Sequence, residues 1–120
     1  MPEARSRITI LLPSPETAAH FVLLDAVITD FVKFCGGATA SIREPHVWDG
    51  SWINPQGTVD YDPIVMIVGD TLAPIGSHAL TDYLESLKLH CQEVFAQDIV
   101  WVTMHAIERI ATADYQRQRR

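Results

Sequence analysis

The stretch RITILLPSPET, residues 7–17, holds the end of one secondary-structure element and the start of the next. Arg7 to Leu12 is an apolar run rich in β-branched residues, which is typical of a buried strand, and Pro13 ends it. Ser14 followed by Pro15 and an acidic residue is the pattern of a helix N-terminus with serine as the N-cap. The stretch therefore predicts a strand that is joined directly to a helix.

The predicted helix extends to Cys35, because apolar residues recur at helical spacing up to that point. Gly36-Gly37 should end it, since glycine adopts the left-handed conformation without strain. The residues that share its apolar stripe are Phe21, Leu24, Ile28, Phe31 and Cys35.

The remaining elements complete a β-α-β-β-α-β order. A weaker strand is predicted over residues 38–43 and an apolar strand, IVMIV, over residues 64–68. A second helix should begin near Ser77, and a last strand should cover residues 98–107. The stripe of the second helix is Leu80, Leu84, Leu87, Cys91 and Val94. This order predicts an α+β, ferredoxin-like domain: a four-stranded antiparallel sheet with the first and third strands central and both helices on one face.

Size and composition limit the class of protein. The chain has 120 residues, which is the length of one domain (1–120), and we expect residues 1–6 and 113–120 to be flexible termini. The net charge of −6 argues against nucleic-acid binding, which needs a basic face. We find no leader peptide and no apolar stretch of about 18 residues, so we expect a cytoplasmic protein without membrane contact.

No cofactor or metal site is expected from the sequence. Two cysteines do not make a zinc ligand set. Three carboxylates, Asp49, Asp60 and Asp62, lack the fixed spacing of a calcium loop. Cys91 lies beside His90, but neighbours on a helix point about 100° apart and do not form a dyad. We therefore interpret both cysteines as buried structural thiols.

Both faces of the predicted sheet are apolar, although the chain has helices for only one. We place Leu11, Val65, Ile67, Ile99 and Trp101 on the face without helices. Leaving these five side chains in water would forfeit on the order of 10 kcal/mol. We therefore expect a homodimer, in which a second copy covers this face or the edge of the last strand, with room for a small apolar ligand between the copies.

The segment HVWDGSWINPQGTVDYD, residues 46–62, reads as an aromatic hairpin with its turn at residues 54–57. If Trp52 lies opposite Val59, then Trp48, Trp52 and Tyr61 share one face. This face either stabilises the hairpin or forms a platform for a planar ligand or a peptide.

His105 is in phase with Trp101 and Thr103 on the face assigned to the interface. It is either a hydrogen-bonded interface residue or a ligand contact and proton shuttle. The candidate ligand-binding or interface residues are Trp48, Trp52, Tyr61, Trp101, Thr103 and His105, and no catalytic residue is assigned.

Three groups of residues resemble small uncharacterised bacterial proteins of ferredoxin-like build: Gly36-Gly37-Ala38-Thr39, then Gly50-Ser51-Trp52 with Gly57 and Asp60, then Gln97-Asp98-Ile99-Val100-Trp101. The resemblance covers residues 36–107. It implies the fold and a bacterial origin, and it implies no activity.

Taken together, the sequence predicts a homodimeric ligand-binding or regulatory module without catalytic activity. One alternative is a small enzyme of the dimeric α+β-barrel kind, with His105 and Trp101 lining a cavity on the open sheet face. Another is a subunit of a hetero-complex anchored by Trp48 and Trp52.

Overall fold

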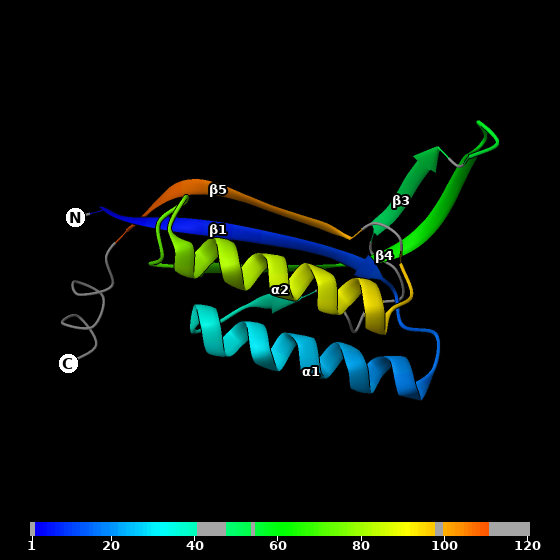
Figure 1. Cartoon of the computed structure of the whole chain (residues 1–120), viewed down its shortest axis with the longest axis horizontal. Coiled ribbons are helices and arrows are strands. Elements are labelled where there is room, and N and C mark those ends of the chain that lie inside the picture. Colours follow the sequence, from blue (N-terminus) through cyan, green and yellow to red (C-terminus); the bar gives the residue numbers. More distant parts are fainter. Residues whose placement is uncertain (1, 41–47, 54, 98–99, 111–120) are drawn as a thin grey trace.

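The computed structural model describes residues 2–40, 48–53, 55–97 and 100–110. Its elements in chain order are β1 (Pro2–Pro13), α1 (Ala18–Cys35), β2 (Thr39–Ala40), β3 (Trp48–Ile53), β4 (Val59–Thr71), α2 (His78–Val94) and β5 (Trp101–Ile110). The sheet has the order β2-β4-β1-β5, and β3 also pairs with β4. Both helices cover the same face of this antiparallel sheet (Figure 1). The predicted ferredoxin-like α+β fold is therefore confirmed, with β1 and β4 as its central strands.

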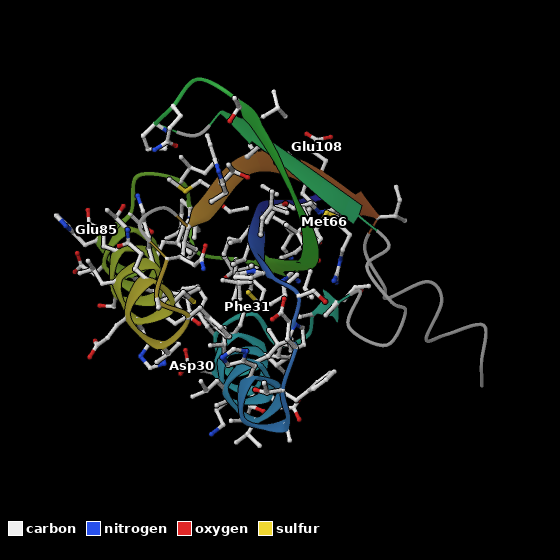
Figure 2. All side chains as sticks on the ribbon, turned by 90° about the vertical axis from the view of Figure 1, so that its right-hand side faces the viewer. Asp30, Phe31, Met66, Glu85 and Glu108 are labelled. Carbon is white, nitrogen blue, oxygen red and sulfur yellow. The ribbon has the colours of Figure 1, made fainter. Side chains whose placement is uncertain are left out.

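The hydrophobic core lies between the two helices and one face of the sheet. Figure 2 shows Phe31 in this layer, between α1 and the strands. Its fully or almost fully buried side chains are Ile8, Ile10, Leu12, Leu24, Val27, Phe31, Val65, Ile67, Leu80, Leu84, Leu87, Cys91 and Val100. Four of the five residues predicted for the second helix stripe are in this set, but only Leu24 and Phe31 of the first. Ile28 and Cys35 are partly buried, so the prediction of a buried thiol is wrong for Cys35, and Phe21 is exposed in the first turn of α1.

Two of the three helix ends predicted from the sequence are confirmed, and one is wrong. Ser77 caps α2, and its side chain accepts a hydrogen bond from the Leu80 N–H. Gly36 ends α1 in the left-handed conformation, with φ of 89°. The predicted cap at Ser14 is wrong: α1 begins later, and Thr17 accepts a hydrogen bond from the His20 N–H. Threonine is also a favoured N-cap, and Thr17 lies three residues after Ser14.

The first strand is longer than its apolar run. β1 begins at Pro2 and pairs with β5 from that residue onward, so residues 2–6 are part of the sheet. The predicted last strand began at residue 98; β5 covers Trp101–Ile110, and residues 98–99 and 111–120 lie outside the described residues. None of the helices in the described ranges has the length and apolarity needed to cross a bilayer.

β3 and the first half of β4 form a hairpin arm that projects from the sheet, away from the helices (Figure 1). The predicted hairpin is present, but its register is wrong by one residue: Trp52 lies opposite Asp60 and Ile53 opposite Val59. The loop contains five residues instead of four, with Gly57 at φ of 81°. Tyr61 lies opposite Ser51, so its position is on the other face of the arm from Trp48 and Trp52.

The assignment of Val65 and Ile67 to the face without helices is wrong. Ile67 lies opposite Ile10 and shares its face, and both Val65 and Ile67 are buried beneath the helices. The open face instead carries Met66 and Val68, which are partly exposed. Every position from 64 to 68 is apolar, so alternation alone could not distinguish the two faces.

Candidate functional site

The open face of the sheet changes from apolar to charged along its length. The strand register places Leu11 between Met66 and Trp101 at the end near the hairpin arm. At the other end, Arg7 lies between Asp70 and His105. The apolar end fits contact with another surface, whereas the charged end fits a polar ligand.

Three of the residues predicted from the sequence lie together on this face. Trp101, Thr103 and His105 are exposed and alternate along β5, as predicted. Trp101 is 48% exposed to solvent. The side chains of Trp48 and Trp52 lie outside the described residues, so their part in the predicted aromatic platform stays a prediction. Tyr61 is not part of that platform, because the register places it on the other face of the arm.

The charged end of the open face contains a groove of about 470 Å³. Three guanidinium groups line it: Arg5 and Arg7 from β1, and Arg109 from β5. The loop from Gly36 to Ala38 and the end of β4 around Asp70 complete its lining. We call this site the arginine groove. Its volume is within the range of small-molecule sites, roughly 300–1,000 Å³.

The groove exists because β2 begins only at Thr39. β2 begins at Thr39, opposite Val68, so the next residues of β4 extend past the strand that would otherwise flank them. The loop after α1 passes this uncovered edge. Gly69 lets α1 approach closely, because a Cβ there would lie 2.6 Å from the Phe31 ring and 3.1 Å from the Cys35 sulfur.

Ion pairs hold the arginine side chains in place. Arg7 donates from Nε and Nη2 to the two carboxylate oxygens of Asp70, at 2.8 and 3.0 Å. Glu3 Oε1 accepts from Arg5 Nη2 at 2.7 Å and pairs with Arg109 Nη2 at 2.8 Å. Such two-pronged pairs fix the orientation of the planar guanidinium group. The site is therefore ordered before any ligand binds.

These contacts also shift the protonation of the two carboxylates. The hydrogen bonds from Arg7 lower the pKa of Asp70, and its partial burial opposes them. The hydrogen bond from Arg5 is the main cause of a lowered pKa at Glu3. Both groups are negative at neutral pH. Three arginines against two carboxylates leave the site with net positive charge, in a chain whose net charge is −6.

One donor of the groove is left without a partner. The Nε of Arg109 is buried, and no other described residue accepts a hydrogen bond from it. A buried donor without an acceptor costs about 1–3 kcal/mol.

Cys35 also lines the groove, but it is not activated for nucleophilic chemistry. Burial raises its pKa to about 11, and the negative charge of Asp70 contributes. Reactive cysteines have a lowered pKa and are thiolates near neutral pH. The Cys35 thiol therefore stays protonated and acts as part of the groove wall.

The arginine groove was not predicted from the sequence. Residues 1–6 were treated as a terminus, and Gly36-Gly37 only as the end of a helix. One signal was present: Glu3, Arg5 and Arg7 alternate with period two, which places them on one face if the strand extends to the start of the chain. Their meeting with Arg109 depends on long-range strand pairing, which no local pattern reveals.

Comparison with known proteins supports the fold. No protein-family model matches the sequence, and no curated protein matches it. A phage SAM lyase, solved in complex with S-methyl-5′-thioadenosine, has a TM-score of 0.57 and 17% identity, covering 92% of this chain and 91% of its own. The divalent cation tolerance protein CutA1 from Thermus thermophilus also has a TM-score of 0.57, with 14% identity, and 94% and 92% of the two chains are covered. At these identities the likeness establishes a shared ferredoxin-like architecture.

Proposed function

We propose that the protein is a homodimeric binding module that holds a small anionic ligand in the arginine groove. The observation that supports this proposal best is the convergence of Arg5, Arg7 and Arg109 on one groove with an excess of positive charge. Guanidinium groups match phosphate and carboxylate oxygens in geometry as well as charge. The ligand is therefore a small molecule that carries a phosphate or carboxylate group.

Close contacts inside the groove, and not the net charge of the whole chain, favour an anion as the ligand. A chain with a net charge of −6 repels anions at long range, so the affinity must come from close contacts inside the site. Arg5, Arg7 and Arg109 supply these contacts from the lining of the groove. The glycine loop at residues 36–37 leaves open space beside the arginines. The planar ligand expected from the sequence was assigned to the hairpin arm, which lies at the opposite end of the sheet (Figure 1), and the small apolar ligand was assigned to the space between two copies.

Self-association is part of the proposal for a separate reason. Trp101 and Met104, on opposite faces of β5, are exposed large hydrophobic side chains. Burying them against a second copy stabilises the assembly by about 25 cal/mol per Å² of apolar surface. Oligomers of one chain most often form closed two-fold dimers.

An enzyme is the second candidate, because one neighbour of the same fold is a lyase. The proton shuttle expected for such an enzyme, His105, is exposed on β5 and does not line the arginine groove. The thiol that does line it, Cys35, is protonated at neutral pH. These two observations favour binding without chemistry.

Isothermal titration calorimetry with inorganic pyrophosphate and with citrate tests the anion site. We expect binding that weakens as salt concentration rises. Arg109→Gln should weaken it by about 10- to 100-fold, because hydrogen bonds to charged groups are worth roughly 1.5–3 kcal/mol. Lys33→Gln removes the same charge from α1, outside the groove, and should leave the affinity unchanged. Absence of binding by both anions at low salt, or an equal loss in both variants, would overturn the anion site.

A further inference from the structure

β5 forms one edge of the sheet. It pairs with β1 along its whole length, from Leu11 opposite Trp101 to Pro2 opposite Ile110. No described strand lies on its other side. A strand of ten residues with one open side presents a row of backbone groups that another strand can pair with.

The sequence of this edge lacks the usual protection against pairing. Proteins commonly guard an exposed edge with charged side chains, especially lysine, or with proline. The segment WVTMHAI, residues 101–107, contains neither proline nor a lysine, arginine, aspartate or glutamate. Charged residues begin only at Glu108, near the end of the strand. Residues 101–107, which make up most of the strand, are therefore open to pairing with another strand.

A second groove, of about 220 Å³, follows this edge between α2 and β5. Its lining is apolar where the helix meets the strand, at Leu84, Val102 and Met104. Met104 is 39% exposed and lies beside the edge. Apolar side chains of a second copy can fill this groove while the two strands pair.

The rim of the groove on α2 carries opposite charges. Glu85 and Lys88 both line it, and both are exposed; Figure 2 shows Glu85 on the outer side of α2. Neither forms a salt bridge with another described side chain. In a two-fold interface each contact occurs twice with the roles exchanged. If two α2 helices pack antiparallel across such an axis, Glu85 of one copy faces Lys88 of the other on both sides of it.

We infer that β5 and the α2–β5 groove form the interface between two copies of this chain. The two β5 strands pair antiparallel and continue the sheet across the two-fold axis. Met104 of each copy lies between the two α2 helices, and Glu85 pairs with Lys88 across the interface. This inference rests on the self-association in the proposed function and names its surface; it does not depend on the anion site.

Charge reversal tests this arrangement, with mass measured by light scattering on the full chain over a range of concentrations. The wild type should reach twice the chain mass of 13.4 kDa. Glu85→Lys and Lys88→Glu should each weaken dimerisation by about tenfold, because each places like charges opposite one another twice. An equimolar mixture of the two variants should recover the dimer, since the charges are then complementary. A mixture that associates no better than the single variants would overturn the interface.

A control on the open face separates this interface from sheet-against-sheet packing. Thr9→Lys adds a charge to the central strand β1, on the open face and away from the edge. It should leave the dimer intact, with circular dichroism confirming the fold of every variant. Dissociation by Thr9→Lys but not by Glu85→Lys would overturn the inference and leave self-association standing. A wild type that is monomeric or trimeric would overturn the inference, whereas the calorimetric result on the anion site is independent of it.

Discussion

Ile10 and Leu11 are neighbours in β1, but they belong to surfaces that are stabilised in different ways. Ile10 lies on the face beneath the helices and is fully buried. Leu11 lies on the open face and is only partly buried. The covered face is held mainly by apolar burial, whereas the open face ends in ion pairs such as Arg7–Asp70. One sheet thus separates the part of the molecule that makes it stable from the part that is available for binding.

The first prediction compares these two neighbours. Ile10→Ala should destabilise the protein by about 2–5 kcal/mol, because it leaves a cavity in a core that cannot collapse fully. Leu11→Ala should cost roughly 1 kcal/mol, since part of the side chain is already in water. Urea unfolding monitored by circular dichroism measures both losses.

Protein concentration sharpens this first comparison. If two copies meet through the β5 edge, the loss for Leu11→Ala does not depend on concentration. A loss that increases with concentration would indicate that a second copy covers Leu11 instead. Equal losses at Ile10 and Leu11 would show that the two faces are not different in the way described.

The elements and their order could be predicted from the sequence because their signals are local. The Ser77 cap, the glycines after Cys35 and the apolar run of β1 act within a few residues. The choice of face in β4 could not be predicted, because Val65 and Met66 are equally apolar and only pairing with β1 distinguishes them. In β1 the polar Thr9 interrupts the run, and there the assignment of Leu11 to the open face was correct.

The candidate site was predicted less well than the fold. Trp101, Thr103 and His105 were placed on the correct face, because strand alternation is local. The arginine groove combines β1, the loop after α1, β4 and β5, which are far apart in sequence. The hairpin register was wrong because the turn at Gly57 accommodates one more residue than the shortest pattern suggested.

The second prediction concerns the point where the covered face meets the arginine groove. Gly69→Ala should destabilise the protein by about 1–3 kcal/mol, because the new Cβ would overlap the fully buried ring of Phe31. Adding Phe31→Leu removes the overlapping ring atoms, so the double variant should lose less than the sum of the two single losses. Urea unfolding of all three variants measures this coupling.

Gly37→Ala is the matched control for Gly69. A Cβ at Gly37 meets no atom within 4 Å, and its backbone is not in the left-handed region. This variant should be neutral or stabilised by up to about 1 kcal/mol, because alanine restricts the unfolded chain. Strict additivity of Gly69→Ala and Phe31→Leu would refute close packing between α1 and β4.

The smallest effect is expected for the ion pairs at the charged end of the open face. The hydrogen bonds from Arg7 hold the pKa of Asp70 below its ordinary value of 3.8. A carboxylate with a lowered folded-state pKa stabilises the protein above its unfolded pKa and loses this contribution as pH falls through the folded value. Because both side chains are partly exposed, the contribution should be below about 1 kcal/mol.

Melting temperatures of the wild type and Asp70→Asn should therefore differ at about pH 6 and converge below about pH 4. Glu16→Gln, which removes an exposed carboxylate outside the groove, should shift the melting temperature little at either pH. A difference in melting temperature between wild type and Asp70→Asn that stays constant down to strongly acidic pH would contradict this prediction. It would mean that the charge of Asp70, and therefore its ion pair with Arg7, does not contribute to stability.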